Sequence, residues 1–560
     1  MKKVFIAWLL LATAVQAQKN IPTDYFDNPI KIPLILSGSF GELRSNHFHS
    51  GLDIKTQQRE GVPIYAPADG FVSRIKVAHY GYGKALYIKH PNGYSTVYAH
   101  LQNYAGDIQE YVKQQQYSKE SFEIELFPEA NQLSVKKGDL IGYTGNSGSS
   151  GGPHLHFEIR DSASRPMNPM LFGIEIPDTK IPLINSVFAY PLGENAHVNK
   201  SNKPTKVRLQ LQKDGSYKAE SIQAFGDIGF GVSSYDQQNG ASNKNGVYKI
   251  TTTYNGEQQI EVLFDKFSFS ETRYLNRFID YEYFRKNKSR VQKLFREPNN
   301  PLSIINDTPE NGIISIEDGF NSTFLIEIED FKKNKITIRV PISGKKDTPI
   351  TKNNNLPEDY VYADQATSIT KGKYSIYIPA NALYENEYLD IDVKGDTLHF
   401  HEDIVPIHKN VTISVDASNY SDTDKGKLYL GRLNYRGEPY YNTTYRKGDK
   451  LSTRTRTMGS YVLVSDTKSP KIQPVNFTDG KWISKNKTLK VKIEDDLSGI
   501  SSYRATINGK FILMEYNYKT DVLTYDFDDN IISETENNLK VIVTDNVGNS
   551  ATFEATFFRK

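Results

Sequence analysis

Three short stretches of the chain carry histidine and aspartate at spacings that can hold a catalytic metal. The first, HFHSGLDI, contains His49 and Asp53; the second, VYAHL, contains His100; the third, HLHFE, contains His154 and His156. The chain has 0 Cys, so imidazole nitrogen and carboxylate oxygen are the metal donors that remain. A metal site in this chain must therefore be built from histidine and carboxylate.

The third stretch has the period of a β-strand. Residues i and i+2 of a strand face the same side, so His154 and His156 point into one space while Leu155 and Phe157 point into the core. The glycine-rich run before it, GYTGNSGSSGGP, lets the backbone turn closely against the site. Two imidazoles on one face suit zinc, or one zinc ligand beside one group that carries a proton.

The first stretch needs a bend before it can bind the same metal. On a straight strand His49 and Asp53 would lie about 13 Å apart, whereas zinc ligands bond at ~2 Å. The intervening Ser50-Gly51 supplies a bend that brings the two side chains together. Two histidines and one aspartate leave the fourth tetrahedral position open for water, as in catalytic zinc sites, and zinc lowers the pKa of that water to about 7.

The second stretch offers a further histidine at the end of a strand pattern. Tyr94, Thr96, Tyr98 and His100 share one face, and His100 ends the run, where a side chain can reach a cleft. A metal hydrolase needs a group that moves the proton of the water and stabilises the developing oxyanion. His100 and His154 fit that need.

The five positions in this order, with the glycine-rich lead-in, resemble the lysostaphin/LytM-type zinc metallopeptidases. The resemblance covers about residues 44–172 and extends through Arg160 and Met167-Asn168-Pro169. It implies an antiparallel β domain of the lysostaphin-like kind, a duplicated hybrid motif, that hydrolyses peptide bonds in the stems or cross-links of bacterial peptidoglycan. The chain has no His-Glu-x-x-His segment, so the thermolysin-like arrangement is absent.

The resemblance also implies roles for the individual residues. It makes His49, Asp53 and His156 the ligands of the cofactor, Zn2+, and makes His100 and His154 catalytic groups. Two other functions stay open: a catalytically inactive regulator of other wall hydrolases, and a module in which the long C-terminal region binds wall or protein. The presence of all five residues argues against the inactive regulator.

The remaining histidines lack a comparable pattern. His47 forms a second His-x-His with His49, and it is either a surface residue or a neighbour of the ligands or substrate. His399-Phe400-His401 has the same spacing but no aspartate in a bend and no glycine lead-in, so we expect an exposed strand there. Arg44 and Asn46 leave the same alternatives open as His47, with the surface favoured, and His79 and His90 are expected at the surface or in turns.

Length and composition predict a mainly β protein of several domains. A chain of 560 residues is too long for one core, and 36 Tyr and 28 Phe favour strands. Turn signals about every 8–12 residues, with a loose repeat of 229–235 at 497–503, resemble immunoglobulin-like β-sandwiches. The expected units are a signal peptide at 1–17, the LytM-type zinc peptidase domain at 18–178, a β-sandwich with a helical insertion at 179–346, a β-sandwich at 347–466 and an immunoglobulin-like domain at 467–560.

Two stretches interrupt the β pattern with helical spacing. Ile108, Tyr111 and Val112 predict a helical insertion within about 104–132, directly after the strand that ends near His100. This insertion is either a surface segment without effect on activity or a rim or lid over the cleft. A charged stretch around 271–295 also predicts helix.

The first residues have the features of a secretory signal. Lys2 and Lys3 precede an apolar stretch, Val4–Ala14, that is too short to span a bilayer, and Val15-Gln16-Ala17 supplies small residues for cleavage. We expect a protein of the periplasm, or of the extracellular space, without a transmembrane segment. A formal net charge of +2 gives no reason to expect nucleic acid as a partner. The expected partners are peptidoglycan peptides, with a protein partner open for the β-sandwich domains.

Overall fold

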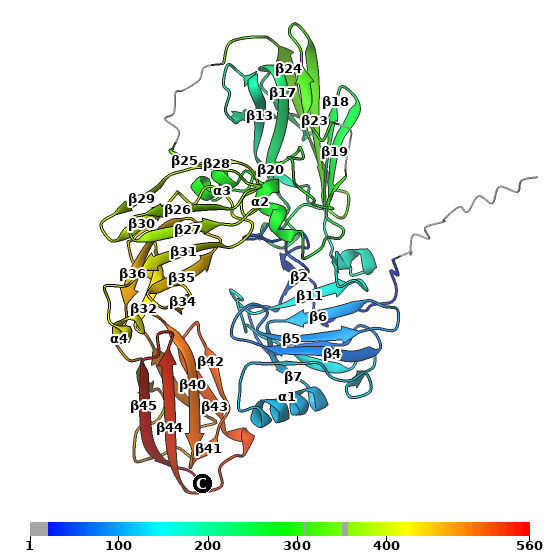
Figure 1. Cartoon of the computed structure of the whole chain (residues 1–560). Helices are drawn as coiled ribbons and strands as arrows, with labels where there is room; N and C mark the ends of the chain where they lie inside the picture. The colour runs from blue at the N-terminus through cyan, green and yellow to red at the C-terminus, as the bar shows by residue number, and fades with distance from the viewer. Residues whose placement is uncertain (1–20, 307–309, 350–356) are drawn as a thin grey trace, which may run out of the picture.

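The computed structural model of the chain describes residues 21–306, 310–349 and 357–560. Strands dominate these residues, which confirms the prediction of a mainly β fold. The predicted signal peptide lies outside the described residues. Among the residues described, no helix is long and apolar enough to cross a membrane. Figure 1 shows β-rich units that follow one another along a curved path, so that the C-terminal unit (red) comes back beside the N-terminal unit (blue).

The N-terminal unit is built on a nine-stranded sheet of order β1-β2-β11-β6-β5-β4-β8, with β12 and β9 paired to β11 and β4, and on a three-stranded sheet, β3-β10-β7. The predicted hairpin around Pro91-Asn92-Gly93 is present as β5 and β6, with Leu86 opposite Tyr98. The elements are β1 (Leu36–Gly38), β2 (Leu52–Lys55), β3 (Pro63–Tyr65), β4 (Gly70–Val77), β5 (Lys84–Lys89), β6 (Ser95–Ala99), β7 (Leu101–Tyr104), β8 (Ile124–Leu126), β9 (Ser134–Val135), β10 (Leu140–Thr144), β11 (His154–Arg160), β12 (Pro166–Met167) and the 3-10 helix η1 (Pro169–Phe172).

The predicted helical insertion is present as α1 (Gly106–Ser118), which lies between β7 and β8. Ile108 and Val112 are buried on one side of this helix, in agreement with the predicted spacing. Another part of the helix contacts the C-terminal unit, where Tyr117 donates a hydrogen bond to Asp529. The insertion therefore lies between two units of the protein instead of standing free in solvent.

A twelve-stranded sheet follows, with the main order β14-β13-β17-β24-β23-β18-β19-β21. It shares one continuous hydrophobic core with the N-terminal unit: the Phe48 ring centroid lies 5.4 Å from that of Phe267 and 6.0 Å from that of Phe264. The helix predicted around 271–295 is present as three short helices that end before β20. The elements are β13 (Leu183–Val198), β14 (Thr205–Val207), β15 (Leu209–Leu211), β16 (Tyr217–Ala219), β17 (Ile222–Tyr235), β18 (Lys249–Tyr254), β19 (Glu257–Leu263), η2 (Thr272–Tyr274), α2 (Leu275–Phe278), α3 (Tyr281–Asn287), β20 (Gln292–Lys293), β21 (Ile305–Asn306), β22 (Ile314–Ile316), β23 (Asn321–Glu329) and β24 (Lys335–Gly344).

The next unit has two five-stranded sheets, β26-β27-β31-β35-β34 and β29-β30-β36-β32-β33, beside the pair β25-β28. One hydrophobic core joins these sheets, as expected for a β-sandwich. The elements are β25 (Asp359–Val361), β26 (Thr367–Lys371), β27 (Tyr374–Ile378), β28 (Glu387–Leu389), β29 (Ile391–Lys394), β30 (Thr397–Phe400), β31 (Val411–Asp416), α4 (Asp422–Lys425), β32 (Leu428–Leu433), β33 (Pro439–Tyr441), β34 (Thr444–Lys447), β35 (Lys450–Thr455) and β36 (Gly459–Ser465).

The last unit pairs a four-stranded sheet, β37-β39-β43-β42, with a five-stranded sheet, β38-β45-β44-β40-β41, around its own core. The loose repeat in the sequence does not extend to the structure, because 229–235 ends the long strand β17 whereas 497–503 contains a turn before β40. The elements are β37 (Lys471–Pro474), β38 (Lys481–Trp482), β39 (Thr488–Glu494), β40 (Ile500–Ile507), β41 (Lys510–Phe511), β42 (Met514–Asn517), β43 (Val522–Asp526), η3 (Phe527–Asp529), β44 (Glu536–Asp545) and β45 (Ser550–Phe558).

Candidate metal centre

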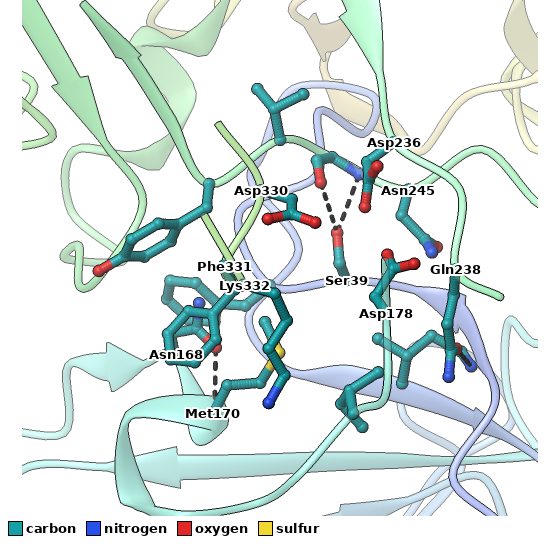
Figure 2. A pocket seen from close by; sticks show the side chains of 16 residues that line it. Ser39, Asn168, Met170, Asp178, Asp236, Gln238, Asn245, Asp330, Phe331 and Lys332 are labelled. Carbon is teal, nitrogen blue, oxygen red and sulfur yellow. Dashed lines mark hydrogen bonds between the residues drawn. The ribbon is translucent and has the colours of Figure 1, made fainter. Parts of the chain in front are cut away.

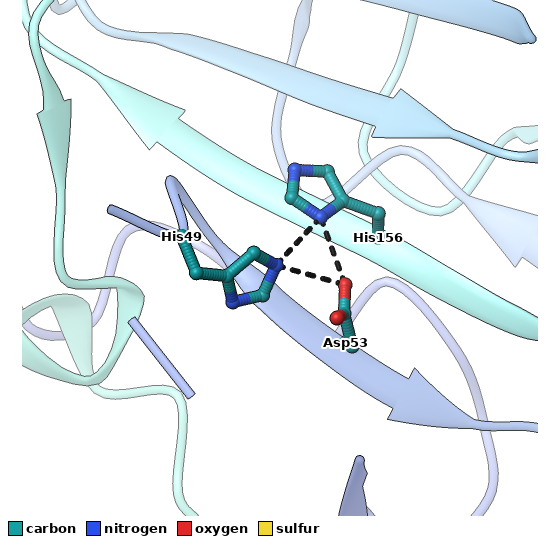
Figure 3. Close-up of side chains that lie close together, drawn as sticks. All are labelled: His49, Asp53 and His156. Carbon is teal, nitrogen blue, oxygen red and sulfur yellow. Dashed lines mark hydrogen bonds and ion pairs between the residues drawn. The ribbon is translucent and has the colours of Figure 1, made fainter. Parts of the chain in front are cut away.

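Three of the predicted residues meet at one point in the N-terminal unit (Figure 3). His49 Nε2 lies 2.9 Å from Asp53 Oδ1, His156 Nδ1 lies 2.9 Å from the same oxygen, and the two ring nitrogens are 3.0 Å apart. Asp53 on β2 stands directly opposite His156 on β11 in the antiparallel pairing. All three side chains are buried, so their donor atoms converge in a place that is largely shielded from water.

The bend predicted at Ser50-Gly51 brings His49 beside Asp53, because the chain turns there before β2 begins. Gly51 also approaches β11 closely: a β-carbon at this position would lie 2.3 Å from the Phe157 carbonyl oxygen. A larger residue would push the two strands apart. Glycine at this position therefore maintains the spacing between the strands that carry the converging side chains.

The two converging histidines are oriented by hydrogen bonds at their other ring nitrogens. His49 Nδ1 donates to the Ser39 carbonyl at 2.7 Å, and His156 Nε2 donates to Glu158 Oε1 at 2.8 Å. Each bond uses the N–H of the ring, which leaves the opposite nitrogen with a lone pair. Two such lone pairs and the Asp53 carboxylate face one another within 3.0 Å. They repel unless a cation lies among them, so this donor set fits a divalent transition-metal ion.

The pKa shifts of Asp53 and His156 favour a cation bound between them. Burial alone would raise the pKa of Asp53, but His49 and hydrogen bonds from the two histidines of β11 hold it well below its usual range. Burial alone would lower the pKa of His156, but hydrogen bonds to Asp53 and Glu158 raise it to about 9. The carboxylate is thus ionised, and a metal ion would take the place of the proton on the imidazole.

His100 and His154 lie beside this point, with ring centroids 4.8 Å apart. His154 Nε2 is 3.4 Å from Asp53 Oδ1. Each ring donates its Nδ1–H to a backbone carbonyl, His100 to Ser147 at 2.9 Å and His154 to Gly152 at 2.8 Å. This arrangement leaves Nε2 of both rings able to accept a proton.

The backbone at His100 is held in an uncommon conformation, with φ at +60°. Its N–H donates to the Tyr82 carbonyl at 2.9 Å, which fixes the turn after β6. Burial, together with nearby His156 and His154, lowers the pKa of His100 to about 3. The imidazole is therefore neutral at pH 7, the form that a proton acceptor needs. Strained backbone of this kind is common at functional sites.

Arg44 lies beside the candidate site, which is the less favoured of the alternatives that the sequence left open. Its Nη2 lies 2.9 Å from Asp53 Oδ2, the carboxylate oxygen that does not face the histidines. A bridge between Leu43 and Phe48 folds this segment back over the sheet, so that Arg44 reaches Asp53 while its side chain stays 35% exposed. By holding Oδ2, the guanidinium leaves Oδ1 directed at the convergence point.

Glu158 is a residue that the sequence pattern did not indicate. It is 0% exposed and accepts hydrogen bonds from His156, Tyr82 and Ser50. Burial alone would raise its pKa, but Arg160 and His156 hold it well below the usual range. A signal was present, because Glu158 continues the i, i+2 row of the histidines on β11.

The other histidines of the N-terminal unit lie outside the convergence point. His47 is exposed, and its Nδ1 bonds the Ser45 carbonyl at 2.8 Å. His90 occupies a turn, as predicted, but it is only 2% exposed because its Nε2 bonds Thr96 Oγ1 at 2.8 Å. Asn46 is exposed, as predicted.

His79 and the second His-x-His have contacts of their own. His79 is half-buried and stacks on Phe122 with ring centroids 5.2 Å apart. His401 Nδ1 accepts a hydrogen bond from the Asp390 amide at 3.0 Å. Neither His399 nor His401 belongs to a cluster of three ligand side chains in the part of the chain that the structure describes, and both are half-buried where an exposed strand was expected.

The C-terminal unit contacts the loop that orients His100. Lys519 Nζ bonds the Asn146 carbonyl at 2.6 Å, and the Tyr518 hydroxyl donates to the Gly148 carbonyl at 3.1 Å, across 370 residues of sequence. These contacts lie on either side of Ser147, whose carbonyl holds the His100 ring. The last β unit therefore supports one edge of the site.

The N-terminal β unit thus directs two histidines and one aspartate at one point, with two further histidines beside them. Residues 47–117 and 129–169 match the family model described as Peptidase family M23. This part of the chain is an M23 peptidase domain, which confirms the predicted relationship. The interruption of the match, 118–128, lies inside the predicted insertion. Residues 358–466 match a Zu5-like domain, within the β-sandwich expected at 347–466.

Sequence relatives share the M23 segment. The chain is 34% identical over 136 residues to the DD-carboxypeptidase/endopeptidase Mpg of Neisseria meningitidis serogroup B, covering 24% of this chain and 25% of the relative. It is 34% identical over 99 residues to the Peptidoglycan DD-endopeptidase ShyC of Vibrio cholerae, covering 18% and 17%. The chain thus spans a quarter or less of the length of these relatives. The catalytic domain of lysostaphin from Staphylococcus simulans is 22% identical, covering 24% of this chain and 90% of that chain, with a TM-score of 0.19.

Proposed function

We propose that the protein is a zinc-dependent endopeptidase that hydrolyses peptide cross-links or stem peptides of bacterial peptidoglycan in cell-wall remodelling. The convergence of His49, Asp53 and His156, with His100 and His154 beside them, carries this proposal. Two imidazole nitrogens and one carboxylate with a fourth position free are the donor set of catalytic zinc. When bound there, zinc would polarise the scissile carbonyl and lower the pKa of water.

Four other residues orient the proposed metal ligands or transfer protons. Arg44 and Glu158 hold Asp53 and His156 in the orientation that directs their donor atoms to the metal. His100 and His154, with Nε2 free on each ring, take the proton of the attacking water and, as imidazolium, stabilise the oxyanion or protonate the leaving amine.

The substrate class and location rest on the relatives, whose names specify peptidoglycan DD-endopeptidase and DD-carboxypeptidase/endopeptidase activity. We expect the cut in a D-Ala–diaminopimelate cross-link. Peptidoglycan lies outside the cytoplasmic membrane, so the protein would act in the periplasm or the extracellular space. The proposal also includes a protein partner for the Zu5-like unit or the last β unit.

Digestion of purified cross-linked muropeptides, followed by mass spectrometry, tests the proposal. We expect fragments that correspond to hydrolysis of one peptide bond, their loss in the presence of a chelator, and their recovery on addition of Zn2+. If the metal-loaded protein cleaves no stem or cross-link peptide, the proposal is wrong and an inactive regulator or a binding module becomes the better description.

Glu158→Gln is expected to weaken zinc binding about 10- to 100-fold, because the hydrogen bond from His156 then ends on a neutral amide. Competition with a metal-binding dye measures this change. Glu125→Gln is the matched control, since its carboxylate pairs with Arg74 at the surface of the same sheet. Equal zinc affinity in the Glu158 variant and the control would contradict the role given to Glu158.

Lys519→Ala is expected to lower kcat about tenfold with little change in zinc content, because the loop around Ser147 loses a contact that fixes the His100 ring. The control is Lys510→Ala, which removes an exposed pair with Glu534 in the same unit. A rise in kcat in the Lys519 variant would show instead that this contact restrains access to the site.

A further inference from the structure

A second group of ligand side chains lies away from the peptidase centre. Asp178, Asp236 and Asp330 each place one carboxylate oxygen within 4.8 Å of the others. Asp178 belongs to the segment that leads into β13, Asp236 follows β17, and Asp330 follows β23. Figure 2 shows the three carboxylates around a common space, with Asn245 beside Asp236 and Asp178.

The space among these residues is a cavity of about 40 Å³, which Asn245 also lines. This volume is enough for one ion with water, since a single water needs about 10–15 Å³. Asn245 is 4% exposed and Asp236 is 7% exposed. Among the described residues no hydrogen-bond donor reaches Oδ1 of either side chain. Buried acceptors without a donor are rare in proteins, and these two line the same cavity as the other carboxylates.

The negative charge of the group is balanced only in part, by neutral donors and by Lys332, which also lines the cavity. Asp178 accepts from the Lys180 amide at 3.1 Å, and Asp330 accepts from the main-chain and side-chain amides of Asn334 at 2.8 and 2.7 Å. Burial and the neighbouring Asp178 and Asp330 carboxylates raise the pKa of Asp236 to about 7. Like charges gathered in a buried place repel one another unless a cation or a proton lies among them.

We infer that Asp178, Asp236, Asp330 and Asn245 form a Ca2+ site, separate from the peptidase centre. The donor atoms of the four side chains are oxygen, which is the preference of a hard cation, and none of the four is a histidine or cysteine that would favour zinc. Ca2+ bonds oxygen at about 2.3–2.6 Å, so oxygens within 4.8 Å of one another can share one ion. Waters in the cavity complete its coordination.

The position of the site indicates a structural role for the ion. Asp178 comes from the segment that leads into the twelve-stranded sheet, Asp236 and Asp330 follow two strands of that sheet, and Asn245 lies in the loop between β17 and β18. Ser39 of the N-terminal unit lines the same cavity, and its hydroxyl accepts from the Gly246 amide at 2.9 Å. The carbonyl of Ser39 also holds His49 Nδ1. Bound Ca2+ therefore fixes the twelve-stranded sheet against the turn that orients a ligand of the peptidase metal, a link to catalysis that rests on the proposed function.

Calcium binding to the full chain, measured by calorimetry and by thermal unfolding, tests this inference with Ca2+ alone as the probe. We expect saturable binding and a rise in Tm of about 5 °C at Ca2+ well above Kd, with a smaller response to Mg2+. Asp236→Asn and Asp330→Asn should lose this response. Both preserve shape and relieve repulsion, so they should fold without Ca2+.

Two control variants show whether loss of the Ca2+ response is specific to these aspartates. Glu257→Gln removes an exposed carboxylate of the same sheet and should retain the full response. His156→Ala should also retain it, so that failure of the peptidase proposal and failure of the calcium proposal are distinguishable. An absent Ca2+ response in the unaltered chain would overturn the inference, because the carboxylates would then be neutralised by protons.

A response that survives in both aspartate variants would equally overturn the inference. It would place the ion at another acidic group, Asp466, Asp495 and Asp545. The carboxylates of that group already accept hydrogen bonds from backbone amides. Ser498 N donates to Asp466 at 3.1 Å, Gly499 N to Asp495 at 2.7 Å and Val547 N to Asp545 at 2.9 Å.

Discussion

His156→Ala is expected to remove the bound metal and to reduce peptide hydrolysis to background. His156 Nδ1 is one of three converging donors, and without it only His49 and Asp53 remain, too few for a stable zinc site. Metal analysis of the purified variant should fall from about one equivalent of zinc to almost none, and muropeptide cleavage should disappear even when Zn2+ is supplied in moderate excess.

The matched control for this experiment is His47→Ala, which alters an exposed histidine only two residues from a proposed ligand. The control should retain both zinc and activity, because its ring bonds only the Ser45 carbonyl. Circular dichroism should show the same β content in both variants, since the Leu155 and Phe157 core beneath the site is untouched. A His156 variant that still holds one equivalent of zinc would refute the ligand assignment.

His154→Ala and His100→Ala are expected to retain zinc but to lose turnover by about 10²- to 10⁴-fold, the range for loss of a general acid or base. Neither ring is among the three converging donors, while both keep Nε2 free beside them. The loss should appear in kcat, with a much smaller effect on KM, because the groups act on the reacting atoms more than on substrate binding.

Zinc content and kinetics are measured on the same preparations of His154→Ala and His100→Ala. Loss of the metal can then be distinguished from loss of turnover. Loss of zinc in His154→Ala would make His154 a ligand, which its 3.4 Å distance to Asp53 Oδ1 does not rule out by itself. Full activity in His154→Ala would contradict the mechanism. Full zinc without any activity in the unaltered chain would favour the inactive regulator.

The sequence left two roles open for the helical insertion: a surface segment without effect on activity, or a rim of the cleft. Its contacts in the structure bear on this choice. Helix α1 and the loop around Ser147 both contact the last β unit, so the insertion packs against the same unit that holds this loop. We favour a structural role, in which these contacts hold the loop that orients His100. The Lys519→Ala measurement distinguishes this role from restriction of access.

Local periodicity in the sequence predicted part of the candidate centre, and the resemblance to a known family predicted the roles of its residues. The i, i+2 spacing of His154 and His156 determined that both rings share a face, and Leu155 and Phe157 are buried as that spacing requires. Gly51 marked the bend before β2, and the hydrophobic period around Ile108 marked the inserted helix. Each of these features depends on neighbours a few residues away.

Tertiary structure alone decided which distant groups complete the centre. Nothing in the spacing of Arg44 indicated that a fold-back would place it 2.9 Å from Asp53, and no local pattern predicts that Lys519 meets the loop beside Ser147. The cavity shared by Asp178, Asp236 and Asp330 likewise exists only because three separate chain segments end at one place. The sequence by itself determined which side chains of the candidate centre share a face, because strand periodicity fixes this. The fold decided how that chemistry is supported, because packing of whole sheets sets the distances between residues far apart in the chain.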